Sequence, residues 1–251
     1  MTRTIKLGLI FLLISVTLSC LGEGEIENSP ETQEYELLFS YGPGSDKYLK
    51  LAIIDYFKLV ALGSEYGASF PITQKWTSNM KIFVGGSPNI ELLSELHIIT
   101  YEINSLVTDG FSIEIVNDSL KSNYYIFFGS GNNYVKKYPK QLKYIHDNWG
   151  LFSISANKDF EITSGHMYVD IERANFVEQK HILREELTQS LGFPNDIQYY
   201  NTSIFYDGWS TTNSYSEFDV EIIRLLYHTK MVSGLNSSSA EGALKAILGI
   251  R

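Results

Sequence analysis

The stretch that decides the fold runs from Asn175 to Asp196 and reads N-F-V-E-Q-K-H-I-L-R-E-E-L-T-Q-S-L-G-F-P-N-D. It begins with a capping box, because Asn175 is followed three positions later by Glu178. It ends with Gly192, a frequent helix-stop residue, and with Pro194, which cannot continue a helix. These signals predict one helix over residues 176–191.

Two sides of this helix differ in chemistry. At about 100° per residue, three leucines gather on one side and predict a buried face: Leu183, Leu187 and Leu191. Polar side chains gather on the neighbouring side: Glu185, Glu186 and Gln189, with His181 one turn earlier on its flank. We therefore expect the helix to pack its leucines in the core and to carry two acids and an amide along one flank.

This arrangement is similar to the zinc-binding helix of the metzincin peptidases. Their motif, H-E-x-x-H-x-x-G-x-x-H, holds zinc with three imidazoles and uses the Glu as general base. On that pattern the three ligand positions are occupied here by Glu185, Gln189 and Asn195, and the general-base position by Glu186. The spacing is kept, while the imidazole ligands are absent.

The resemblance continues downstream. The residues Ser203, Phe205 and Tyr206 resemble the metzincin turn below the metal, with Phe205 in place of its Met, and Asp219 lies where a closing helix would begin. Together with E-F-D-V-E-I-I-R-L-L-Y and M-V-S-G-L, these motifs resemble a bacterial domain-of-unknown-function family, numbered 2927, over roughly residues 76–248. Its members are proposed lipoproteins related to zinc peptidases, and the family has no established activity.

Hydrophobic periodicity predicts the other elements. Helices are expected over residues 46–62, 88–107, 216–228 and 238–248, and strands over 80–84, 111–116, 124–128, 151–156 and 167–171. This order matches the upper subdomain of metzincin-like peptidases. The resemblance thus implies an α+β fold, with a mixed twisted sheet, a backing helix, a central active-site-type helix and a mostly helical C-terminal part.

Composition bounds the partners. With 251 residues, of which 44% are hydrophobic, the chain can form one full core, and we expect a single domain over residues 35–251. The net charge is −9, and no zinc knuckle or basic-aromatic pattern indicates a nucleic-acid partner. The one local basic patch, residues 136–143, is expected to be a solvated surface, with contact to anionic headgroups as the alternative.

The N-terminus predicts export. Arg3 and Lys6 precede an apolar run over residues 7–18, which is too short to span a bilayer, so residues 1–19 are expected to be a signal peptide. Cys20 then resembles a bacterial lipobox cysteine, although Thr17 replaces the usual Leu. The resemblance implies a lipid-anchored envelope protein on the periplasmic or outer surface, with residues 20–34 as a flexible acidic tether. The alternative is an ordinary secretory signal.

The site chemistry favours loss of activity. A catalytic zinc needs about three protein ligands and an open position, and the amides of Gln189 and Asn195 are poor zinc donors. Without a metal, Glu186 is a weak base. We expect no cofactor and a polar seam that joins the helix to the loop at Asn195 and to the turn at Ser203. The alternative is a weakly held divalent metal on His181, Glu185 and Asp196.

Three functions therefore stay open. In the first, a pseudo-metallopeptidase binds a peptide, glycan or protein partner, and residues 151–156 form the edge strand that a peptide would extend. In the second, the chain is a metal-dependent hydrolase with atypical ligands. In the third, it is a structural envelope lipoprotein.

Overall fold

The computed structural model describes residues 46–62, 71–198 and 200–250. The predicted signal peptide, Cys20 and the acidic tether lie outside these residues. None of the helices in the described ranges has the length and apolarity that a membrane span requires.

A six-stranded sheet forms the centre of the N-terminal part of the described structure. Its strands are β1 (Lys75–Trp76), β2 (Met80–Gly86), β3 (Ile113–Val116), β4 (Tyr124–Phe128), β5 (Gly150–Ala156) and β6 (Glu161–Val169). The main order is β3-β2-β4-β6, all parallel, with β1 beside the start of β6. The strand β5 pairs antiparallel with the other side of β6 and makes the sheet mixed.

Helices cover both faces of the sheet. The strand β6 contributes to both sides, because its successive residues point to opposite faces. Met167 and Val169 join the main core with the buried residues of α3 (Ile90–Leu106) and α5 (Phe176–Gln189). Tyr168, between them, joins a second cluster with Tyr134 of α4 (Gly131–Lys137). Two short 3₁₀ helices complete this part: η1 (Ser119–Lys121), between β3 and β4, and η2 (Pro139–Gln141), after α4.

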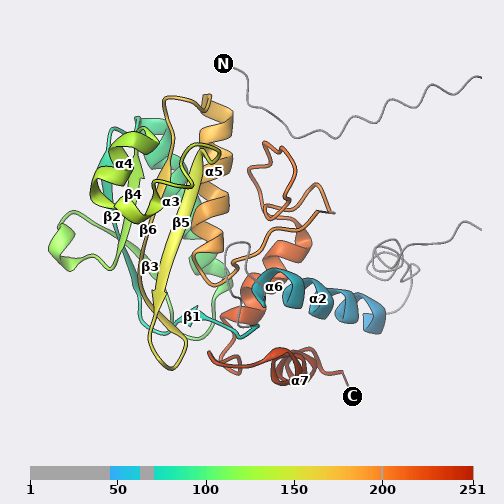
Figure 1. The fold of residues 1–251 in the computed structure, drawn as a ribbon. Helices are drawn as coiled ribbons and strands as arrows, with labels where there is room; N and C mark the ends of the chain where they lie inside the picture. The colour runs from blue at the N-terminus through green and yellow to red at the C-terminus, as the bar shows by residue number, and fades with distance from the viewer. Residues whose placement is uncertain (1–45, 63–70, 199, 251) are drawn as a thin grey trace, which may run out of the picture.

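The C-terminal part is helical, apart from the long loop that leads into α6. There α2 (Asp46–Ala61) packs against α6 (Glu217–Leu226) and α7 (Ser237–Leu248). Figure 1 shows these three helices together at one end of the molecule, with α5 running from them along the sheet. The predicted α+β class is thus confirmed, with α3 as the backing helix and α5 as the central one.

Most predicted boundaries agree with the structure to within two or three residues. Residues 124–128 form a strand as predicted, and α5 begins at Phe176 but ends at Gln189, two residues early. The prediction for β6 was wrong at both ends. The strand starts at Glu161, ahead of the alternating residues, and stops before Asp170, whose carboxylate accepts the backbone N–H of Glu172 and Arg173 and so forms a turn.

Candidate functional site

The helix α5 is fixed at its start by the predicted capping box. Asn175 Oδ1 accepts the backbone N–H of Val177 at 3.0 Å and of Glu178 at 3.2 Å, and Glu178 Oε2 accepts the N–H of Asn175 at 2.7 Å. Leu183 and Leu187 are fully buried in the main core. The start of α5 and its buried leucine face therefore match what the local sequence predicts.

The exit from α5 requires glycine. Gly192 has φ +123°, and a Cβ at this position would lie 2.0 Å from the carbonyl oxygen of Gln74. Two aromatic donors hold the preceding carbonyls: Trp76 Nε1 donates to Ser190 O at 3.0 Å, and the Tyr227 hydroxyl donates to Leu191 O at 2.8 Å. The chain must therefore leave the helix in one direction, toward Asn195 and Asp196.

Two of the three positions that the resemblance aligned with zinc ligands contact different elements. Gln189 Nε2 donates to Asp196 Oδ1 at 2.5 Å, so the second position is joined to the loop by a hydrogen bond. Asn195 Nδ2 instead donates to Leu59 O at 2.9 Å and faces α2. The first of these contacts is the kind that the polar-seam interpretation expects. The second contact ties the third position to α2.

His181 and Glu185 form a pair one turn apart on α5. His181 is 7% exposed, and its Nδ1 lies 2.6 Å from the carbonyl oxygen of Thr212, which can only accept, so the proton is assigned to Nδ1. Its Nε2 lies 3.4 Å from Glu185 Oε2. Burial lowers the pKa of His181 more than the hydrogen bond to Thr212 raises it. Burial therefore disfavours the charged form of this imidazole.

Glu186, at the general-base position, lies under the first residue of β5. A Cβ on Gly150 would lie 2.5 Å from Glu186 Oε1 and 2.3 Å from Ile182 Cγ2. Only glycine permits this close approach of strand and helix. The carboxylate of Glu186 is thus held at the point where the edge strand passes over α5.

The turn at Ser203 is organised by the buried carboxylate of Asp219. Its Oδ1 accepts the hydroxyls of Tyr56 at 2.6 Å and Ser203 at 2.8 Å, and its Oδ2 accepts the backbone N–H of Ile204 at 3.1 Å and Ser216 at 2.8 Å. Burial, together with the charge of Asp219, raises the pKa of Tyr56 well above its ordinary value, so this hydroxyl stays protonated and donates.

The two other residues predicted at this turn lie in the same layer. Phe205 is fully buried against Phe193, with ring centroids 5.4 Å apart, and Tyr206 forms a parallel bridge with Ile197. The turn therefore packs against the segment that leaves α5, through Phe205 on Phe193 and Tyr206 beside Ile197.

These residues do not fit a tetrahedral zinc site. Within the described ranges, no group of three or more His, Cys, Asp or Glu side chains is arranged to hold a metal ion. Of the alternative metal set, His181 and Glu185 lie next to each other. Asp196 instead contacts Gln189, which is two turns after His181 on α5. Two of the three aligned positions carry amide side chains, which are poor zinc donors, in place of imidazoles.

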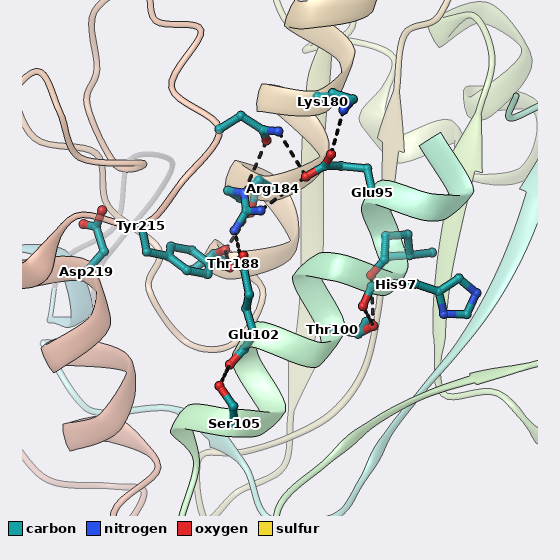
Figure 2. Close-up of polar contacts among 12 residues, drawn as sticks. Glu95, His97, Thr100, Glu102, Ser105, Lys180, Arg184, Thr188, Tyr215 and Asp219 are labelled. Atoms are coloured by element: carbon teal, nitrogen blue, oxygen red, sulfur yellow. Dashed lines mark hydrogen bonds and ion pairs between the residues drawn. The ribbon is translucent and has the colours of Figure 1, made fainter. Parts of the chain in front are cut away.

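Sequence reasoning missed a buried ion network behind the polar flank (Figure 2). The guanidinium of Arg184, 2% exposed, contacts Glu95 at 3.2 Å and also donates to Glu102. Lys180 lies 2.9 Å from Glu95, and Asn213 donates to it at 3.0 Å. Burial by itself raises the pKa of Glu95, but these hydrogen bonds and charges outweigh it and hold that pKa below its ordinary value.

The network fastens the segment 210–215 onto α5. Besides Asn213, the hydroxyl of Tyr215 lies 2.8 Å from Thr188 Oγ1, and Arg184 lies 4.7 Å from the Tyr215 ring centroid. No local sequence pattern predicts these contacts, because the partners of Arg184 on α3 lie more than 80 positions away in the chain. The segment contacts the polar flank at His181, and β5 contacts it at Glu186.

The outer edge of β5 carries backbone groups that do not point to β6. Asp170 donates its N–H to Trp149 O at 2.8 Å, which fixes the alternation of bonded and non-bonded pairs along the two strands. Ile154 lies opposite Gly165, whose N–H is directed to the β4 side at 3.0 Å. Phe152 and Ile154 therefore direct their N–H and C=O groups outward.

Aromatic side chains lie at the entrance of this edge. The rings of Trp149 and Trp209 meet edge to face at 6.2 Å, and Trp209 is 60% exposed. They connect the start of β5 with the loop that continues into the segment 210–215. The start of β5 thus lies beside the polar flank of α5 and the aromatic pair of Trp149 and Trp209.

The model of a family described as protein of unknown function (DUF2927) matches residues 50–246. No curated protein matches the sequence. Two solved structures of myroilysin are similar, the first at 11% identity with a TM-score of 0.39, covering 62% of this chain and 96% of that chain. The second has 13% identity and a TM-score of 0.32, and covers 70% and 72%.

Proposed function

The chain belongs to the DUF2927 family, and on that premise we propose that it is a lipid-anchored envelope protein whose peptidase-type cleft binds an extended peptide along β5 without cleaving it. The observation that carries the proposal is the outward row of backbone groups on β5, next to the polar flank of α5. An extended peptide gains affinity from main-chain hydrogen bonds when it adds to such an edge.

The same geometry argues against catalysis by the residues present. The general-base position is kept by Glu186, which lies against Gly150. Two of the three ligand positions carry amides, whose NH2 groups donate to Asp196 and to Leu59 O, and amides are poor zinc ligands compared with imidazole. The scaffold that would position a peptide is retained, and the chemistry that would cut it is not supplied.

Anchoring is supported by the sequence alone. The basic residues before the apolar run and Cys20 at its end are the features of a lipoprotein signal. Incorporation of radiolabelled palmitate tests this part of the proposal. Labelling should be lost in Cys20→Ser, and labelling that persists in this variant would contradict it.

Peptide binding is tested by removing one outward donor. Ile154→Pro deletes an N–H that points away from β6, so the sheet keeps its hydrogen bonds, and proline is tolerated on an edge strand. Ile154→Ala is the matched control, because it shortens the same side chain and keeps the N–H. On an array of extended peptides, the proline variant should lose the signal of the wild-type chain, and the alanine variant should keep it. Equal signals for the two variants would exclude strand addition at β5.

Metal dependence is tested on the same preparations. Dialysis against a chelator followed by addition of zinc or manganese should leave the melting temperature unchanged, because no convergent ligand set is formed. A stoichiometric metal that is lost in Glu185→Ala would show that the hydrolase alternative is correct.

A further inference from the structure

One segment of this acidic chain is strongly basic. Residues 119–146 contain five lysines and no Asp, Glu or Arg, whereas the whole chain has a net charge of −9. Four of the lysines are exposed on α4 and the turns after it, namely Lys136, Lys137, Lys140 and Lys143. None of the four forms an ion pair with any residue in the described ranges. Their charges are therefore available to an external partner.

Contacts join this segment into one surface. Lys81 of β2 and Lys121 of η1 line the same open depression. Phe83, two residues after Lys81 and thus on the same side of the strand, stacks on Tyr125 with centroids 6.0 Å apart. Lys137 Nζ lies 3.6 Å above the Tyr125 ring. We call this surface the basic face: Lys81 with the exposed side chains of η1 and of residues 136–143.

Two leucines protrude from the basic face. Leu120 of η1 is 94% exposed, and Leu142, between Lys140 and Lys143, is 61% exposed. A single exposed leucine is ordinary. Leucines that stand among unpaired lysines combine the two attractions of a bilayer surface, because lysines are drawn to anionic headgroups and apolar side chains to the acyl boundary.

We propose that the basic face docks the domain on a bilayer that contains anionic lipids. The lysines contact the headgroups, and Leu120 and Leu142 enter the boundary of the acyl chains. A nucleic acid fits less well, because its phosphates would use the lysines and leave both leucines in water. The docking goes beyond the proposed function and does not require acylation of Cys20.

The chain length allows an anchor and the basic face to meet the same bilayer. In Figure 1, α2 begins on the side of the molecule away from α4. Residues 21–45 separate Cys20 from α2, and 25 residues can extend over at most about 85 Å. A compact domain of this size is roughly 40 Å across. The linker can therefore pass around the domain.

The test uses the full chain carrying Cys20→Ser, so that no acyl chain contributes. Sedimentation is compared with vesicles of phosphatidylcholine alone and with vesicles of equal parts phosphatidylcholine and phosphatidylglycerol. The chain should bind the second and not the first. The triple variant K136Q/K140Q/K143Q should bind more weakly by about 5-fold per lysine, on the order of 100-fold in all. The matched control K47Q/K158Q/K230Q removes three exposed lysines elsewhere and should bind normally.

A second variant separates the bilayer from simple charge attraction. Leu142→Ser keeps every charge and should weaken vesicle binding by about 10-fold, because one buried leucine is lost. Unchanged vesicle binding of Leu142→Ser, with equally tight binding to heparin, would show attraction to any polyanion and would overturn the proposal. Equal binding by the two triple variants, or no binding to anionic vesicles, would also overturn it. Unchanged melting temperatures verify that the variants are folded.

Discussion

Replacing Arg184 by Met should destabilise the protein strongly, because it leaves the buried charge of Glu95 without its guanidinium. The side chains of Arg184 and Glu95 are 2% and 4% exposed and lie 3.2 Å apart. Removal of one partner from a buried pair costs about 3–5 kcal/mol, because the other charge stays buried. Lys180, 2.9 Å from Glu95, and Asn213, at 3.0 Å, remain and compensate in part. We therefore expect the free energy of unfolding to fall by about 3 kcal/mol.

The measurement is urea denaturation of the full chain, followed by far-ultraviolet circular dichroism. The matched control is Arg224→Met, since Arg224 is 52% exposed in its pair with Glu221 at 2.8 Å. An exposed pair of this kind contributes about 0.5 kcal/mol or less. Hydrogen exchange should in addition show that the segment 210–215 loses protection in the Arg184 variant before the sheet does.

A double variant identifies the source of the loss. Arg184→Met combined with Glu95→Leu removes both charges from the buried site, so much of the stability lost in the single variant should return. If Arg184→Met costs no more than Arg224→Met, the network does not fasten the segment to α5, and the reasoning from burial is refuted.

Three further predictions follow from other contacts. The free energy of unfolding should fall by up to about 3 kcal/mol between pH 6.5 and 4, because burial lowers the pKa of His166 to about 4 and the unfolded chain takes up that proton first. Urea denaturation at a series of pH values should show a weaker dependence of this free energy on pH for His166→Gln, and an equal dependence in the two proteins would contradict the prediction. Gly192→Ala should prevent stable folding, since its Cβ would meet a backbone carbonyl, whereas Gly242→Ala within α7 should raise the melting temperature, and the reverse order would be decisive against the argument from geometry. Tyr56→Phe should lower the free energy of unfolding by about 1.5–3 kcal/mol, as expected for a lost hydrogen bond to a charged group; Tyr101→Phe, 76% exposed, serves as the control, and equal effects of the two changes would disprove a special role for the buried hydroxyl.

Local signals were sufficient for most of the elements, although β1 and α4 were not predicted. The start of α5 follows from Asn175 and Glu178, and β4 from the run Tyr124–Phe128, because capping and strand alternation act between near neighbours. The class of the fold was what the resemblance of this element order to metzincin-like peptidases implied. The end of β6 could not be predicted, since it depends on how the carboxylate of Asp170 folds back on the next backbone amides.

The sequence predicted the polar flank of the candidate site but not the partners of its side chains. Spacing placed Glu185, Glu186 and Gln189 on one flank of α5, and the helical repeat guarantees that result. The direction of Asn195 toward Leu59 O could not be derived, because it depends on the packing of α2 against the exit of α5. The partners of Arg184 were hidden for the same reason, since periodicity carries no information about which distant carboxylate a buried guanidinium meets.

The attachment of α2 has a mechanical meaning for an anchored chain. A pull transmitted from the membrane enters the described part of the molecule at Asp46, the first residue of α2. From there, force passes through the Tyr56 hydroxyl to Asp219 and through Leu59 O to Asn195, so it is taken up at the base of the helical half. Neither of these two contacts involves β5, so under the proposed anchoring the tension would be applied away from the edge that we propose to bind peptide.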